Sequence, residues 1–310
     1  MQKSSLRLKK IIFICCGLVC VTPFVDSSIA LLAGIVIVNI IGNPFEEKTA
    51  SLMHQLLKLS VIGLGFGVNF HEAIKAGESG LVVTIFSIFI TISLGLLLGR
   101  FFKTEKKTSL MISSGTAICG GSAIAAISPV IKADSKQISM ALGVVFLLNC
   151  VALFIFPAIG HYFKLSQEQF GLWAAITIHD TSSVVGAASK YGNEALQIAT
   201  TVKLCRALWI IPVSLIFSYL FGGDKKKVTT PYFIIGYIVA MLLSTYLPQL
   251  HEISTEISKV SKLGFSGTLF LVGTGLSKEA LKHVGLKPLL QGILTWVFIS
   301  VVALVYCMGL

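Results

Sequence analysis

Charged residues are scarce in this sequence, and acidic residues are scarcer than basic ones. Only 13% of the 310 residues are charged, with 14 Asp and Glu against 25 Lys and Arg, and the mean hydropathy is +0.86. Soluble domains are nearer a quarter charged, because their surface must be solvated. The composition therefore excludes a soluble domain and predicts one integral membrane domain over residues 1–310.

Several motifs of catalysis and energy coupling are also missing. No G-x-x-x-x-G-K-[ST] run is present, which excludes an ATP-driven pump on this chain. H-E-x-x-H, a paired-carboxylate motif and a selectivity-filter signature are absent as well, so we expect no enzyme, no metal and no other cofactor. The seven cysteines lack C-x-x-C spacing and lie in apolar runs, which favours reduced thiols over disulfides.

The net charge of +11 does not indicate a nucleic-acid partner, because no basic patch alternates with aromatic residues. Instead the basic residues cluster in short connections, as they do in cytoplasmic loops of membrane proteins. We therefore predict that the N-terminus and the later basic loops lie in the cytoplasm. These clusters are Lys3, Arg7, Lys9 and Lys10; Arg100, Lys103, Lys106 and Lys107; and Lys225, Lys226 and Lys227.

Apolar windows follow one another along the whole chain. Many approach the roughly 20 residues that a helix needs to cross a bilayer, which predicts an all-α, polytopic transmembrane fold with 9–11 spans. The first window resembles a signal peptide, but we interpret it as a spanning segment because a second window follows at once. The windows lie at about 11–25, 28–42, 52–71, 80–102, 108–131, 137–160, 168–190, 195–221, 231–247, 255–276 and 285–310.

Two windows contain polar residues at their centres. The window 108–131 holds several hydroxyls, three glycines and Pro129, which predict an interrupted helix. The window 168–190 places His179 and Asp180 in the middle of an apolar run. Such centres must face protein or water. Both windows are therefore expected to be interrupted helices or re-entrant hairpins.

Weak internal repeats relate residues 52–160 to residues 168–310. At a spacing of 60, Ile118 matches Ile178 and Ser122 matches Ser182; at a spacing of 208, Gly65, Gly67 and Gly77 match Gly273, Gly275 and Gly285. Chance similarity among apolar helices is the alternative. If the two polar windows are re-entrant, the repeats are inverted, as in many secondary transporters. If they cross fully, residues 108–160 and 168–221 run parallel instead.

The glycine-rich window is a candidate anion site. A helix that restarts after Gly120 and Gly121 presents free N–H groups, a positive dipole end and the Ser122 hydroxyl. Thr116 adds a second hydroxyl nearby. The alternative is a small-residue packing face between helices.

His179 and Asp180 are candidates for ion coupling. Asp180 is the only acid well inside an apolar window, and the imidazole beside it titrates near neutral pH. Thr181 and Ser182 follow directly and are assigned to the substrate site. A purely structural pairing of Asp180 with a cation is the alternative.

Lys203 and Arg206 are the candidate cations. They lie three residues apart and share one face of a helix, too deep for both to reach the membrane surface. They either neutralise Asp180 or bind an anionic substrate directly. Two cations against one acid favour an anion.

Together these motifs resemble those of the YeiH-type sulfate exporter family. The run from Gly115 to Ala126 is similar to its S-x-C-G-x-S-A-x-x-A segment, with Thr116 where Ser is usual. Thr177–Asp180 resembles T-[VI]-H-[ED], and Lys203-Leu204-Cys205-Arg206 with Pro212 resembles K-x-x-R-x-x-x-x-x-P. The resemblance implies a bacterial inner-membrane protein of the group of sodium/proton antiporters and bile-acid symporters. It also implies interrupted helices that cross fully.

The expected function is secondary active transport of a small anion, such as sulfate, a sulfonate or a carboxylate. The family name supports an anion more strongly than it supports sulfate. The expected partners are the anion, H⁺ or Na⁺ as coupling ion and the lipid bilayer, and a homodimer is compatible with the sequence. The alternatives are a passive anion channel and, less favoured, an intramembrane enzyme that uses His179 and Asp180.

Overall fold

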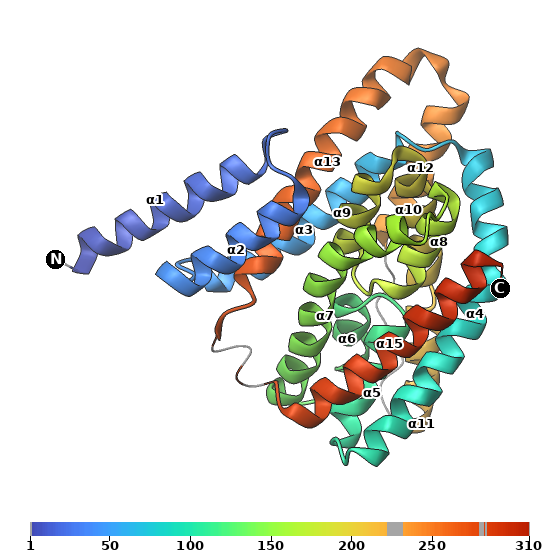
Figure 1. Cartoon of the computed structure of the whole chain (residues 1–310). Helices are drawn as coiled ribbons and strands as arrows, with labels where there is room; N and C mark the ends of the chain where they lie inside the picture. The colour runs from blue at the N-terminus through green and yellow to red at the C-terminus, as the bar shows by residue number, and fades with distance from the viewer. Residues whose placement is uncertain (1, 222–231, 279–281, 283, 310) are drawn as a thin grey trace. The chain divides into compact units, whose positions relative to one another are not determined.

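The computed structural model describes residues 2–221, 232–278, 282 and 284–309 (Figure 1). All regular secondary structure in these residues is helical, which confirms the all-α prediction. The predicted basic loop at Lys225–Lys227 lies outside the described residues.

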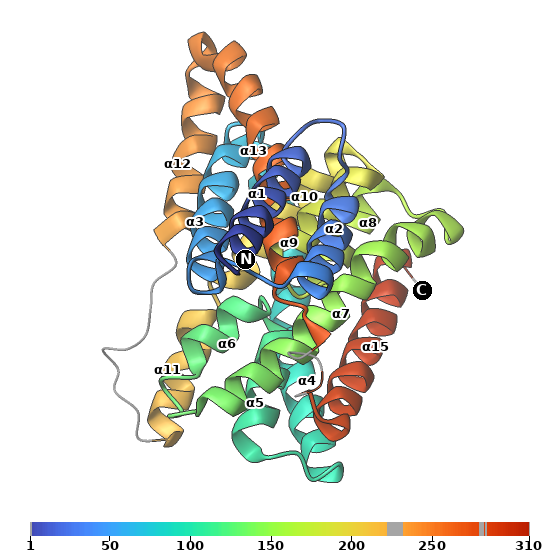
Figure 2. The same ribbon diagram turned by 90° about the vertical axis from the view of Figure 1, so that its left-hand side faces the viewer.

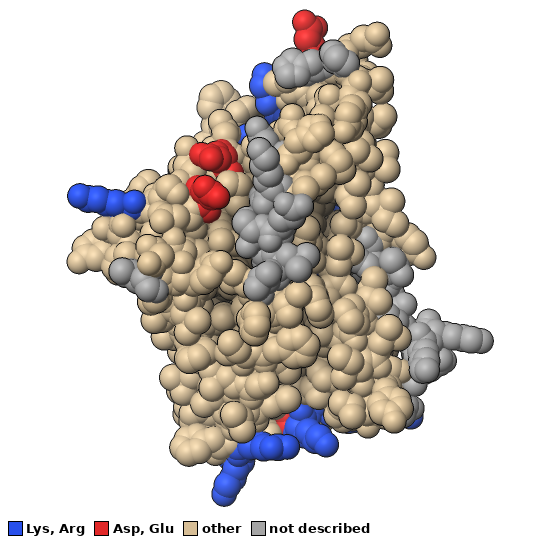
Figure 3. All heavy atoms as spheres, turned by 90° about the vertical axis from the view of Figure 1, so that its right-hand side faces the viewer, with Lys and Arg blue, Asp and Glu red and all other residues tan. Residues whose placement is uncertain are grey.

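Four helical segments are long and apolar enough to cross a membrane, and two shorter apolar helices, Ser27–Ile41 and Tyr232–Tyr246, accompany them. Figure 3 shows a group of Lys and Arg side chains at the lower edge of the view, below a broad surface without charge, and further charged side chains at the left and at the top. The protein is therefore a polytopic membrane protein. The four segments are Val83–Phe101, Ser135–Tyr162, Asn193–Phe221 and Leu286–Met308.

The helices form two compact units. Unit 1 comprises Met1–Glu72 and Tyr232–Ala280, and unit 2 comprises Ala73–Pro231 and Leu281–Leu310. The helices of unit 1 are α1 (Gln2–Cys20), α2 (Ser27–Ile41), α3 (Glu46–Gly65), α12 (Tyr232–Tyr246), the 3₁₀ turn η2 (Pro248–Leu250) and α13 (His251–Thr274).

In unit 1, α13 packs against both α2 and α3 (Figure 2). The α2 contact is so close that a Cβ built on Gly34 would lie 2.1 Å from the carbonyl oxygen of Phe270. Helices α3 and α13 run antiparallel, with Gly63 beside Ser261 and Ser60 beside Gly264. Small residues thus bring these backbones together, as is usual for helices in membranes.

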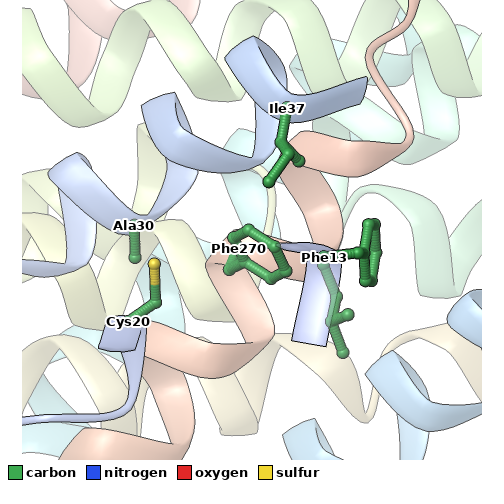
Figure 4. Close-up of a cluster of buried hydrophobic side chains, with 6 residues drawn as sticks. Phe13, Cys20, Ala30, Ile37 and Phe270 are labelled. Carbon is green, nitrogen blue, oxygen red and sulfur yellow. The ribbon is translucent and has the colours of Figure 1, made fainter. Parts of the chain in front are cut away.

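A cluster of buried apolar side chains joins α1 to the rest of unit 1 (Figure 4). Phe13 of α1 meets Phe270 of α13 edge to face, with ring centroids 5.4 Å apart. Cys20, Ala30 and Ile37 complete the labelled group. Unit 1 therefore has a core of its own.

Unit 2 contains long helices and two pairs of short ones. The long helices are α4 (Phe70–Phe101, which starts in unit 1), α7 (Ser135–Tyr162) and α15 (Leu286–Met308). The short pairs are α5 (Lys106–Ala117) with α6 (Gly121–Ile127), and α8 (Gln167–Thr177) with α9 (Thr181–Tyr191). The helices α10 (Asn193–Ala207) and α11 (Ile210–Phe221) follow one another.

The pair α5–α6 is a re-entrant hairpin, here called hairpin 1. Lys107, near the start of α5, donates a 2.6 Å hydrogen bond to the carbonyl of Lys132, which follows α6. The Gln137 side chain also donates to Glu105 across the same end. Because both ends of the segment lie together, the chain turns back at Ile118–Gly120 and does not cross.

The pair α8–α9 is a second re-entrant hairpin, here called hairpin 2. The Tyr191 hydroxyl at the end of α9 donates a 2.6 Å hydrogen bond to the carbonyl of Leu165, which precedes α8. The Tyr191 ring also stacks on Phe170 of α8, with centroids 3.9 Å apart. An α-helix of 11 residues is only about 16 Å long, so each arm reaches roughly half-way through a membrane.

The two hairpins enter unit 2 from opposite ends. Helix α7 starts at the base of hairpin 1 and ends at the base of hairpin 2, where His161 stacks on Tyr191. Helices α10 and α11 return, so that Phe221 lies under the Lys106 ammonium, 5.2 Å from ring centroid to nitrogen. This geometry selects the inverted arrangement over the parallel one, and it differs from the fully crossing helices that the family resemblance implies.

The long helices reinforce this inversion. The first arm of hairpin 1 packs antiparallel to α4, with Gly95 beside Ser113 and Gly99 beside Ser109. The first arm of hairpin 2 packs antiparallel to α15, where two indole N–H groups cross the interface. The Trp173 indole donates to the Ser300 carbonyl, at 2.9 Å, and the Trp296 indole donates to the Thr177 carbonyl, at 3.0 Å. The exact bounds of the predicted repeats stay a prediction.

Candidate functional site

The tips of the two hairpins lie against each other. A Cβ built on Gly120 of hairpin 1 would lie 3.4 Å from both the carbonyl carbon and the Cβ of His179 in hairpin 2. Gly120 has φ +64°, a conformation that favours glycine. The two windows singled out in the sequence therefore meet at one place, although they are 60 residues apart.

Hairpin 2 is tightly fixed at its tip. The Asp180 carboxylate caps α9 by accepting from the backbone N–H groups of Ser182, at 3.0 Å, and Ser183, at 3.3 Å. The Ser182 hydroxyl donates to the same carboxylate. From α7, the Asn149 side-chain oxygen accepts from the N–H groups of His179, at 2.9 Å, and Asp180, at 3.2 Å. These bonds satisfy the donors that a broken helix exposes.

The carboxyl end of α8 is also satisfied by side chains. The Lys203 ammonium of α10 donates to the carbonyls of Ile178, at 2.6 Å, and Ala175, at 3.3 Å. The Trp296 indole N–H donates to the carbonyl of Thr177, which lies between Ala175 and Ile178 in the sequence. A cation at this position also opposes the negative end of the helix dipole.

At the tip of hairpin 1, Arg206 binds the end of α5. Its Nε donates a 2.7 Å bond to the carbonyl of Ala117, the last residue of α5, and its Nη1 donates a 2.9 Å bond to the Ser87 hydroxyl of α4. No side chain caps the start of α6, where Gly121 and Ser122 are half-buried. The two predicted cations thus bind one hairpin each.

Several buried polar atoms near the tips have no hydrogen-bond partner. Both ring nitrogens of His179 are among them, although the ring lies close to the backbone of Val145. Lone buried polar groups cost about 1–3 kcal/mol each, so a ligand that satisfied them would bind favourably. The others are Thr116 Oγ1, Asn149 Nδ2 and Arg206 Nη2, on side chains that are 2% exposed or less.

The structure places the remaining predicted residues as follows. Thr181 is buried at the first turn of α9. No ion pair joins Asp180 to Lys203 or Arg206 in the described part of the chain, because all three side chains bind helix ends. Among residues 2–221, 232–278, 282 and 284–309, no cluster of His, Cys, Asp and Glu could hold a metal ion.

Sequence reasoning missed Asn149, Ser87 and Trp296 as parts of this site. Asn149 was visible as a polar residue inside an apolar window, but Asn39 and Asn69 carry the same signal. Only the fold distinguishes Asn149, because it shows that its side-chain oxygen accepts from two backbone N–H groups at the tip of hairpin 2. Ser87 and Trp296 carry no local signal at all.

These features define a polytopic helical membrane protein in which two opposed re-entrant hairpins meet beside buried cations. The chain belongs to the family described as conserved hypothetical protein 698, whose family model matches residues 17–292. This finding confirms the resemblance seen in the sequence motifs.

Relatives from three bacteria cover nearly the whole chain, and each is named a UPF0324 membrane protein. The relative from Bdellovibrio bacteriovorus is 49% identical, over 95% of this chain and 92% of its own length. Those from Shewanella oneidensis and Vibrio parahaemolyticus are 48% and 50% identical, over 96% and 93% of this chain and 94% of their own length in both cases. No solved structure matches the chain significantly.

Proposed function

We propose that the protein is a secondary active transporter of a small anion, and not an enzyme. The anion binds between the tips of hairpins 1 and 2 in unit 2, and access alternates between the two sides of the membrane. The proposal includes a place in the bacterial inner membrane with the N-terminus in the cytoplasm. A proton or sodium gradient drives the cycle.

The meeting of the two tips is the observation that carries this proposal. Opposed broken helices that meet half-way give each side of a membrane its own half of one site, as alternating access requires. An open channel needs a continuous water-filled path instead. The contact between Gly120 and His179, with His179 fully buried, favours a closed site over a pore.

The charge of the site favours an anion over a cation. Lys203 and Arg206 are fully buried, and Asp180 is the one acid beside them in the described residues. The formal sum at the tips is +1. In a medium of low polarity, one negative charge on the ligand would neutralise this excess. The free N–H groups of Arg206 and Asn149 are donors, which oxyanions accept well.

A ligand screen followed by vesicle transport tests the proposal. Purified protein is warmed with sulfate, sulfite, sulfonates or small carboxylates, and a specific anion raises its melting temperature by mass action. The anion that stabilises the protein is then supplied to proteoliposomes under an imposed pH or sodium gradient. Saturable, gradient-driven accumulation supports the proposal. Flux without coupling would indicate a channel, and chemical conversion of the anion would indicate an enzyme.

A further inference from the structure

The carboxyl ends of α5 and α8 are natural cation sites. Each helix stops inside the protein, where its last carbonyls have lost their intrahelical partners and carry the negative end of the dipole. In transporters such unwound carbonyls coordinate Na⁺. The question for this protein is what occupies them.

At hairpin 2 the occupant is the Lys203 ammonium. It lies 2.6 Å from the Ile178 carbonyl and 3.3 Å from that of Ala175, and the side chain is fully buried. The Trp296 indole takes the carbonyl of Thr177. Three carbonyls at the end of α8 are therefore already bound by donors of the chain itself.

At hairpin 1 the occupant is the Arg206 guanidinium. Its Nε lies 2.7 Å from the Ala117 carbonyl, and its Nη1 lies 2.9 Å from the Ser87 hydroxyl. The carbonyls of Ser114 and Gly115 accept from the backbone N–H groups of Ile118 and Gly120. The two cations come from one face of α10. Lys203 binds carbonyls at the end of α8, and Arg206 binds the carbonyl at the end of α5.

We propose that Lys203 and Arg206 are tethered cations that permanently occupy the places where alkali ions would bind to the two broken helices. Sodium then has no site at the hairpins, and transport proceeds without it. This consequence for coupling rests on the proposed transport function, whereas the occupied cation sites do not.

The proposal predicts how salts affect the purified full-length protein. Sodium chloride and choline chloride of equal concentration should give the same melting temperature, because donors of the chain already bind the last carbonyls of α5 and α8. Any ligand found in the screen should be accumulated equally in sodium and in choline. A melting temperature at least several degrees higher in sodium would overturn the proposal, whether or not transport is found.

Removal of the ammonium should create a site for a free cation. Lys203→Ala deletes a propylammonium group, so this variant should melt at a lower temperature and recover by about 5 °C or more in millimolar propylammonium. Propanol at the same concentration should not restore it. Arg206→Ala should instead respond to ethylguanidinium. Lys259→Ala is the matched control, since Lys259 is 64% exposed on α13, and it should respond to neither cation.

Propylammonium should stabilise Lys203→Ala, and ethylguanidinium should stabilise Arg206→Ala. This difference between the two variants separates specific cation sites from a general effect of salt. If Lys203→Ala cannot be purified, Lys203→Met keeps most of the side-chain volume, and ammonium should stabilise it relative to choline. Lack of any cation-specific recovery in these variants would overturn the proposal. A failure of the transport proposal would appear in the anion screen or in the vesicle assay, and it would leave this result unchanged.

Discussion

Hairpins 1 and 2 share a topology but differ in how firmly their tips are held. At hairpin 2, Asp180, Asn149, Lys203 and Trp296 together bind both backbone ends of the break. At hairpin 1, Arg206 binds the end of α5, and no side chain caps α6. The second arms also differ, with 7 residues in α6 and 11 in α9.

The difference suggests that the two hairpins move to different extents during the proposed transport cycle. A tip with many buried hydrogen bonds moves only if all of them break together, whereas a tip with few can rearrange at low cost. We therefore expect hairpin 2 to be the fixed half of the site and hairpin 1 to be the half that moves during transport. The following predictions test this comparison.

The largest effect is expected from Arg206→Ala. The substitution removes the side chain that binds the tip of hairpin 1 and leaves the Ala117 carbonyl and the Ser87 hydroxyl without a donor. Each such loss costs about 1–3 kcal/mol. Transport should be abolished while the protein still inserts, as measured by vesicle uptake and membrane fractionation. The exposed Arg100→Ala should transport normally. Normal uptake by Arg206→Ala would reduce Arg206 to a packing role.

The next effect is expected from Asn149→Leu, which keeps the volume but removes the acceptor for two N–H groups of hairpin 2. The free energy of unfolding should fall by about 1–3 kcal/mol. Hydrogen exchange should accelerate at residues 178–184 and stay unchanged at residues 116–124. Ile155→Val, at a partly exposed position on the same helix, should change stability by less than about 0.5 kcal/mol. Equal acceleration at both tips would contradict the comparison.

A smaller effect is expected in hairpin 1, where alanine at Gly120 should cost more stability than alanine at Gly121. Gly120→Ala puts a side chain at φ +64° and against His179, which should cost about 1–2 kcal/mol. Gly121 is the first residue of α6, and an alanine there meets the edge of the Phe146 ring at 3.2 Å and Leu142 at 3.5 Å without positive φ, so its cost should be smaller. Thermal unfolding of the two variants measures the difference. Equal stability would show that the tip does not need its left-handed residue.

The smallest effect on binding, but a specific one, is expected from His179→Gln. The buried ring lies near the Lys203 and Arg206 cations, so a proton on it would make the site more positive and favour the anion. By reciprocity, anion and proton should travel together. The Gln variant should bind the anion at pH 8 as wild type does, yet lose the pH dependence of uptake. An unchanged pH profile would exclude His179 as the coupling residue.

Much of this fold was predictable from the sequence. Each of the apolar windows falls on a helix or a hairpin, except that the window 195–221 holds both α10 and α11, because hydropathy and glycine or proline breaks act locally. The windows around Gly120 and His179 were predicted as broken for the same reason. Polar residues in an apolar run also pointed to the place where the two hairpin tips meet.

The course of the two broken segments could not be predicted, because a helix break looks the same whether the chain continues or turns back. Long-range contacts decide it, such as Tyr191 with Leu165 and Lys107 with Lys132. The sequence also indicated two buried cations and one buried acid, and the structure shows Lys203, Arg206 and Asp180 buried. It could not show that Lys203 and Arg206 bind helix ends, because those carbonyls exist only once the helices are broken in space.

The central claim is that hairpin 1 enters the membrane from one side and hairpin 2 from the other, and that each returns to its own side. Cysteine accessibility tests this claim most directly. Single cysteines replace four exposed lysines, Lys106 and Lys132 at the base of hairpin 1 and Lys164 and Lys190 at the base of hairpin 2. Intact cells are treated with an impermeant thiol reagent, and the unsubstituted chain gives the background of its own seven cysteines. We predict labelling at 164 and 190 and protection at 106 and 132. Opposite results for the two members of either pair would mean that this segment crosses the membrane, and would contradict the account.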